Sequence, residues 1–228
     1  VAQLLSDALE VTGSLALVTL VLTLFIGVPA GIWLADHSEK WYSLPLSMLS
    51  QVSISIPSFC MAIFLISIFT VGLKWLPSIG FVSFSESPIG WLRSLLLPSI
   101  SLALGTSAVV IRYVKVSVNG QRKQDYERTA YSKGLGRRKV MYRHVVRNSL
   151  IPVITIFGMT AADILGGSII VENVFSMPGI GRLISVSISS RDLPLLQGLT
   201  FYLALIVVVC NFAVDLIYSL VDPRIRLK

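Results

Sequence analysis

The sequence contains few charged residues, few cysteines and few histidines. Of its 228 residues, only 14% are Asp, Glu, Lys or Arg and 54% are hydrophobic, proportions that exclude an ordinary soluble domain. Its two cysteines, Cys60 and Cys210, both lie in apolar segments, so neither a disulfide framework nor a thiolate metal site is expected. The composition instead predicts a polytopic membrane protein.

Sequence patterns for catalysis are also missing. There is no G-x-x-x-x-G-K-[ST] phosphate loop, and the GLGRRK segment at 134–139 lacks the strand and helix context that a phosphate cradle needs. The two histidines, His37 and His144, are far apart in the chain, and no pair of acids has a spacing typical of hydrolases. We therefore expect no enzyme activity, no metal and no cofactor in this chain.

Long uncharged segments are what the sequence has in abundance. Five of them have about the length of a membrane-spanning helix, roughly 20 residues. The expected spans are 12–34, 43–73, 94–111, 148–171 and 193–214. The predicted fold class is therefore all-α, with residues 1–228 forming a single membrane domain of about five transmembrane helices.

The second expected span is longer than one straight crossing requires. Pro45 and Pro57 interrupt its backbone hydrogen bonding, so we expect a tilted or kinked helix. Its first half is rich in polar side chains, which favour contact with other helices or with a watery path over contact with lipid. The pathway candidates in this segment are Ser50, Gln51, Ser53 and Ser55.

One acid, Asp163, lies inside the fourth expected span. It precedes Gly166 and Gly167 by three and four residues, which places it on a helix face of small residues suited to close helix approach. A hydrogen bond to a neighbouring helix is the favoured role. Because acids within spans also mark transport pathways, Asp163 is the fifth pathway candidate.

A cationic block, residues 121–147, separates the third and fourth expected spans. From Arg112 to Arg147 there are eleven Lys or Arg and only two acids, so this part of the chain must lie in water. Gly134 and Gly136 divide the block into two pieces compatible with helices. We therefore predict a short pair of cytosolic helices that binds a partner.

Cationic residues are distributed unevenly between the two sides of the expected bundle. With the cationic block in the cytosol, fifteen Lys and Arg lie on that side and four on the other. The positive-inside rule then predicts an external N-terminus for this chain and a cytosolic C-terminus. A loop that only sets orientation is the simpler alternative for the block. Nucleic-acid binding is not expected, because the block is tethered between spans and has only three tyrosines for stacking.

The segment 172–192, between the fourth and fifth expected spans, has a different character. It contains a Pro-Gly turn followed by a short amphipathic piece that is too weak to span a membrane. We expect a re-entrant or surface element on the side opposite the cationic block.

The cationic block resembles the cytosolic loop of permease subunits from bacterial ATP-driven (ABC) importers. That loop has the form E-A-A-x-x-x-G followed by I-x-L-P, and it docks on an ATPase subunit. Here Arg128, Thr129, Ala130 and Gly134 occupy the pattern, but Arg128 replaces the Glu, and the proline is Pro152 rather than thirteen residues after the glycine.

These departures are similar to one subgroup, the dipeptide, oligopeptide and nickel permeases, whose loop reads T-A-R-A-K-G-L and then R-H-x-x-R-N-x-L-x-P. The matching residues here are Thr129, Ala130, Tyr131, Ser132, Lys133, Gly134, Leu135, Arg143, His144, Arg147, Asn148, Leu150 and Pro152. The similarity continues through VENVFSMPGIGR (171–182), RDLPLLQG (191–198) and VDPRIR (221–226). It covers nearly the whole chain, which resembles a permease core lacking its first N-terminal span.

The resemblance implies a type I ABC importer transmembrane domain in the bacterial inner membrane. Its implied partners are a second homologous permease, two cytosolic ATP-binding subunits, an external substrate-binding protein and the lipid bilayer. The implied ATPase-coupling residues are Asp125, Glu127, Arg128, Thr129, Ala130, Lys133, Gly134, Leu135, Gly136 and Arg143. We expect import of short peptides, with nickel or a metal chelate as the alternative cargo. An ion-coupled secondary transporter is the alternative from another class.

Overall fold

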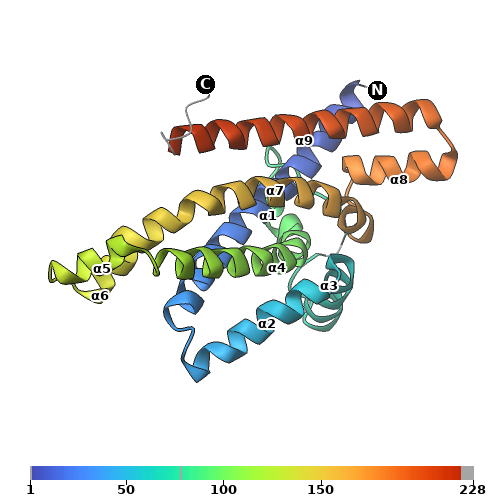
Figure 1. Ribbon diagram of the computed structural model, residues 1–228. Helices are drawn as coiled ribbons and strands as arrows, with labels where there is room; N and C mark the ends of the chain where they lie inside the picture. The colour runs from blue at the N-terminus through green and yellow to red at the C-terminus, as the bar shows by residue number, and fades with distance from the viewer. Residues whose placement is uncertain (1, 78, 222–228) are drawn as a thin grey trace.

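The structure is a computed structural model that describes residues 2–77 and 79–221, and within these ranges it contains helices and no strand. Figure 1 shows long helices with shorter ones at their ends. The long helices are α1 (Ala2–Asp36), α4 (Pro88–Gln121), α7 (Val146–Val174) and α9 (Leu193–Val221). All four are long and apolar enough to cross a membrane, which confirms the all-α membrane fold predicted from the sequence.

The second expected span is broken rather than gently bent. It consists of a 3-10 turn (Trp41–Ser43), α2 (Leu44–Ser55), α3 (Ser58–Leu65) and a π-helical stretch η2 (Ile66–Gly72). The two halves meet at 107°. Because Pro57 has no N–H and disfavours a helical conformation for the residue before it, Ile56 is extended, with φ −90° and ψ 120°. The predicted kink is confirmed, and counting this pair as one crossing gives five spans.

The third span begins earlier than the sequence predicted, at Pro88 rather than at residue 94. Ser87 caps the helix, because its Oγ accepts a hydrogen bond from the Gly90 N–H at 3.1 Å and Pro88 suits the first helical position. At its other end α4 continues past Arg112 to Gln121. The helix therefore reaches beyond the apolar segment and leads directly into the cationic block.

Helix α1 packs tightly along α4 because two glycines remove side chains from the contact. A Cβ on Gly27 would lie 2.8 Å from Val110 Cγ1, and one on Gly31 would lie 2.6 Å from Val114 Cβ. Buried residues of α1, α4 and α7 make up most of the main core, among them Val11, Leu15, Leu95, Leu102 and Val171, and Phe175 directly after α7 and two residues of α3 also belong to it. The three helices therefore form the packed centre of the domain.

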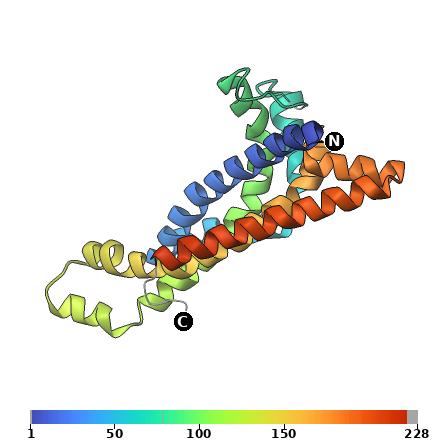
Figure 2. The same cartoon turned by 90° about the horizontal axis from the view of Figure 1, so that it is seen from above.

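Short helices lie at the two opposite ends of this packed centre (Figures 1 and 2). At one end are α5 (Asp125–Ser132), α6 (Arg137–Val140) and a π-helical turn, η3 (Met141–Val145), which leads into α7. At the other end, near the N-terminus, is α8 (Ile180–Ser190). This arrangement confirms the predicted helix pair in the cationic block and the predicted short element after the fourth span.

Candidate functional site

The cationic block presents a small helical cap, here called the coupling surface, which consists of α5 and the turn to α6 (residues 125–136). Gly134 turns the chain with φ +75°, a conformation that favours glycine. Gly136 then precedes the first turn of α6 as its N-cap. Most side chains of the expected coupling set are exposed, namely those of Asp125, Arg128, Thr129, Lys133 and Arg143. Nine of the ten expected residues lie on this surface, whereas Arg143 lies on η3.

Apolar side chains attach the coupling surface to the membrane helices. Ala130 is buried, and Tyr126 and Leu135 are partly buried against the same cluster. The cluster continues through α6 and η3 into α4 and α7, with Val114, Val118, Val140, Met141, Val145 and Val153 as further members. The coupling surface is therefore packed onto the ends of two membrane helices and is not a loose loop. The π-helical form of η3 is a feature that recurs at functional sites.

Asp36, at the end of α1, joins a third membrane helix to two arginines that flank the coupling surface, Arg122 and Arg137. Its Oδ1 lies 3.0 Å from Arg137 Nη2 and 3.5 Å from Arg122 Nη2, and Arg122 Nη1 also donates to the Ala35 carbonyl at 2.9 Å. The hydrogen bond from Arg137 to Asp36 raises the pKa of that guanidinium above its ordinary value, so it stays charged. The sequence placed Asp36 in a polar turn and gave no signal for this contact, which spans 101 residues.

A cavity of about 220 Å³ lies where the broken span meets α4 and α7. We call it the break cavity, and its lining is Ile54, Ser58, Leu102, Gly105, Thr106, Val109, Asp163, Ile164 and Gly167. The structure thus places Asp163 beside the helix break. Within the described residues, its exposed carboxylate forms no hydrogen bond or ion pair, so the hydrogen bond to a neighbouring helix that the sequence favoured stays a prediction.

The other four pathway candidates lie on α2, outside the lining of the break cavity. Three of them direct their hydroxyl groups to their own helix: Ser50 donates to the Ser47 carbonyl, Ser53 to Leu49 and Ser55 to Gln51. Such bonds satisfy a hydroxyl within the helix and let it tolerate an apolar environment. Ile54 and Ser58, which flank the break, line the cavity instead.

Glu172 is a buried acid that the sequence reading placed at the edge of a loop. Its side chain is fully buried, and its carboxylate accepts hydrogen bonds from Thr12 Oγ1 at 2.8 Å, from the Gly181 N–H at 2.8 Å and from the Arg182 N–H at 3.3 Å. Thr12 Oγ1 in turn accepts from the Ile180 N–H at 2.9 Å. We call this network the α8 anchor, because it fixes the N-terminus of α8 to α7 and α1.

The two glycines of the P-G-I-G segment are required by the α8 anchor. A Cβ on Gly179 would overlap Glu172 Oε2, and one on Gly181 would overlap Ile169 Cα. A Glu that follows an apolar span and precedes closely spaced glycines was the available sequence signal. It indicates a carboxylate that approaches the backbone at a helix start.

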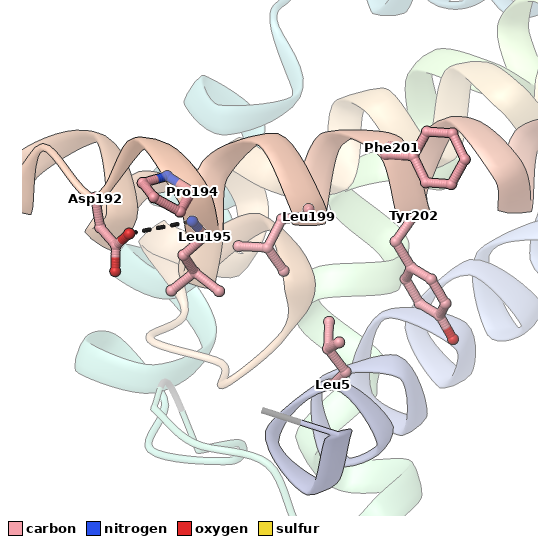
Figure 3. Close-up of a pocket in the computed structure, with 8 residues that line it drawn as sticks. Leu5, Asp192, Pro194, Leu195, Leu199, Phe201 and Tyr202 are labelled. Carbon is pink, nitrogen blue, oxygen red and sulfur yellow. Dashed lines mark hydrogen bonds between the residues drawn. The ribbon is translucent and has the colours of Figure 1, made fainter.

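An apolar groove of about 490 Å³ lies between the start of α9 and the start of α1. Figure 3 shows Leu5 of α1 facing Leu195, Leu199 and Tyr202 of α9 across it. Asp192 contributes the polar end by capping α9, since its Oδ1 accepts a hydrogen bond from the Leu195 N–H at 3.1 Å. The remaining lining is mostly hydrocarbon, which suits lipid or helix contact more than recognition of a polar solute.

Comparisons with known proteins give a consistent result. Residues 27–227 match the family model described as binding-protein-dependent transport system inner membrane component. A putative peptide transport system permease protein of Brucella abortus strain 2308 is 39% identical over 226 residues, which cover 99% of this chain and 72% of the relative. The oligopeptide transport system permease protein AppB of Bacillus subtilis strain 168 is 35% identical over 228 residues, with the same coverage of each chain.

Solved structures show the same fold at low sequence identity. A chain of the inward-facing MetNI methionine ABC transporter superposes with a TM-score of 0.80 at 17% identity, over 96% of this chain and 97% of that one. A chain of an amino acid ABC transporter solved with histidines superposes with a TM-score of 0.68 at 16% identity, over 98% of this chain and 95% of that one. The predicted type I importer fold is thus confirmed. This chain belongs to the family of binding-protein-dependent transport system inner membrane components and is a multi-pass ABC permease subunit.

Proposed function

We propose that this permease carries short peptides into the bacterial cell, driven by ATP that separate subunits hydrolyse. Relatives at 35% to 39% identity over 99% of the chain are named as peptide or oligopeptide permeases. The single observation that carries the mechanism is the apolar cluster that runs from the coupling surface into α4 and α7. It provides a mechanical link between a cytosolic partner and the membrane helices.

In the proposed complex, the coupling surface binds a groove on one ATP-binding subunit. Exposed Arg128 and Lys133 supply its cationic contacts, and Gly134 shapes the turn. When the ATPase subunits close and reopen, α6 and η3 transmit the displacement to α7 through continuous helix, and the Asp36 contact transmits it to α1. A closely packed core moves as a unit rather than deforming continuously, so the displacement reaches the break cavity.

The remaining partners and the orientation belong to the same proposal. A second homologous permease completes the pathway, and an external binding protein delivers the peptide near α8. The coupling surface and the end of α9 then face the cytosol and the start of α1 faces outside, as the distribution of cations favours; the two terminal residues themselves lie outside the described ranges. Labelling of single cysteines with a membrane-impermeant maleimide tests this orientation, because a label on the coupling surface in intact cells contradicts it.

Charge reversal tests the ATPase contact directly. We expect Arg128→Glu combined with Lys133→Glu to abolish co-purification of the ATPase subunit while the permease remains folded, because both side chains are exposed. Lys74→Glu combined with Arg93→Glu is the matched control, since it makes the same charge change at exposed sites outside the coupling surface. ATPase capture that the first variant leaves unaltered contradicts the proposal.

Uptake by the assembled complex tests the cargo. ATP-dependent accumulation of labelled tripeptides in proteoliposomes supports peptide import, whereas accumulation of nickel alone favours the metal alternative. Uptake by the isolated permease, driven by an ion gradient without ATP, contradicts the proposed ATP-driven mechanism.

A further inference from the structure

We propose that the break cavity is a subsite for a primary ammonium group and that Asp163 recognises the charged amino terminus of a peptide as it crosses the membrane. This inference rests on the proposed peptide import. It adds a specificity determinant within the permease itself, beyond any selection by an external binding protein.

The position of Asp163 makes a structural role difficult to explain. The fourth span runs from Pro152 to Val174, so Asp163 lies eleven residues from each end, about 16 Å at 1.5 Å per residue. An ionised side chain at this depth is costly unless it faces a watery cavity or a cation. Both recorded ion pairs among the described residues involve Asp36, and neither involves Asp163.

The helix break supplies a second negative feature on the same cavity. The last carbonyl groups of α2 have no helical donors, because the helix ends at Ser55 and Pro57 has no N–H. These groups form the negative end of the helix dipole. The Ser53 carbonyl oxygen comes within 3.8 Å of the site of a Cβ on Gly105, a residue that lines the cavity. A carboxylate and a helix C-terminus therefore converge where α2, α4 and α7 meet.

The shape of the cavity favours one end of a ligand rather than a whole peptide. Its volume of about 220 Å³ is below the roughly 300–1,000 Å³ typical of complete small-molecule sites. Gly105 and Gly167 leave room beside the carboxylate, and Ile54, Leu102, Val109 and Ile164 give apolar walls. Broken helices at membrane depth are tolerated where they line such a cavity.

The ligand that this chemistry fits is a primary ammonium. Peptide α-amino groups have pKa values of about 7.7–8.0 in water, so most are protonated at pH 7. An ammonium has three donors, which can be shared between a carboxylate and free carbonyl oxygens. Charge-assisted hydrogen bonds of this kind are roughly twice as strong as neutral ones. The same chemistry is offered by a lysine side chain, which the experiment has to distinguish.

The test uses the complete importer in proteoliposomes, with its binding protein and ATP. Three probes are compared: a neutral tripeptide with a free amino terminus, its N-acetylated form, and an N-acetylated tripeptide that contains one lysine. Only tripeptides that calorimetry shows to saturate the binding protein are used. Asp163→Asn removes the charge at constant size and Asp163→Glu keeps it. Met159→Leu is the control, because Met159 is 61% exposed on the same helix and does not line the break cavity.

We expect Asp163→Asn to lower the uptake rate of the free-terminus tripeptide about tenfold or more and to leave the acetylated form unchanged. Asp163→Glu and Met159→Leu should stay within about twofold of wild type. A similar decrease in the uptake rate of the acetylated lysine tripeptide shows that the subsite accepts any primary ammonium. An unchanged uptake rate for that tripeptide shows that the subsite accepts only the α-ammonium. Both results support the proposal.

Three results overturn the subsite. They are equal losses for the free and acetylated tripeptides, no loss for either, and loss of the second permease from the Asp163→Asn complex, which would show that the carboxylate pairs with protein instead. Failure of the wild-type complex to take up any of the three tripeptides refutes the proposed function itself. Normal wild-type uptake with an unaffected Asp163→Asn variant refutes the subsite alone.

Discussion

Removal of the Glu172 carboxylate is expected to release α8 from the membrane helices. In Glu172→Ala two buried donors, the Thr12 hydroxyl and the Gly181 N–H, lose their acceptor. An unsatisfied buried donor costs about 1–3 kcal/mol, so the pair costs about 2–6 kcal/mol. Because the variant no longer has to bury a carboxylate, part of that cost is offset. We therefore expect a loss of about 2–4 kcal/mol, a large fraction of the roughly 5–15 kcal/mol typical of a folded protein.

Limited proteolysis with trypsin measures this release locally. Arg182 lies in the first turn of α8, and its backbone N–H bonds to Glu172, so cleavage after it requires α8 to open. A loss of 2 kcal/mol multiplies the open population by roughly 30. When reclosing is fast, the cleavage rate follows that population. We expect cleavage at Arg182 to accelerate by at least about that factor, with a lower unfolding temperature for the purified permease.

Two further variants separate the α8 anchor from a general effect of losing an acid. Glu10→Gln is the control, because Glu10 is exposed and accepts a hydrogen bond from the half-buried Ser83; its effect should stay within about 0.5 kcal/mol. Thr12→Val interrupts the same network, so its effect and that of Glu172→Ala should not be additive in the double variant. Unchanged cleavage at Arg182 in Glu172→Ala, or full additivity, refutes the anchor.

Three smaller perturbations test other parts of the domain. Gly31→Ala should lower the unfolding free energy by about 1–3 kcal/mol, because its Cβ would lie 2.6 Å from Val114 Cβ; Val114→Ala in the same chain should restore part of the melting temperature. Asp36→Asn should change the unfolding free energy by less than about 1 kcal/mol, since surface ion pairs contribute little. It should nevertheless lower the amount of peptide taken up per ATP hydrolysed, because the proposed mechanism transmits the ATPase movement to α1 through Asp36. Gly134→Ala should lower the unfolding free energy by about 1–2 kcal/mol, because Gly134 has a φ of +75°, and thermal melting measures this loss. Gly136→Ala is the control, since a Cβ there would have open space around it.

The parts of the fold that depend on local chemistry were predictable from the sequence. The length of uncharged segments predicted the spans, because lipid requires about 20 apolar residues for each helix. Gly134 and Gly136 predicted the division of the cationic block, since a glycine tolerates the turn between two short helices. Pro57 predicted an interruption of the second span, but not its angle of 107°. That angle depends on how α3 packs against α4 and α7, which no single segment specifies.

The three acids Asp36, Asp163 and Glu172 show where prediction from sequence stops. All three are similar in the sequence, single carboxylates within or next to apolar segments, yet their partners differ completely. Asp36 pairs with arginines 86 and 101 residues away, Glu172 bonds to a hydroxyl 160 residues away, and Asp163 faces a cavity. In each case, placing a charged carboxylate in or near lipid costs free energy unless another group compensates the charge. What differs is the group that compensates it, and tertiary packing alone brings that group into place. An acid near the centre of a span, with no compensating group among the residues that the structure describes, is therefore the one most strongly expected to serve a ligand.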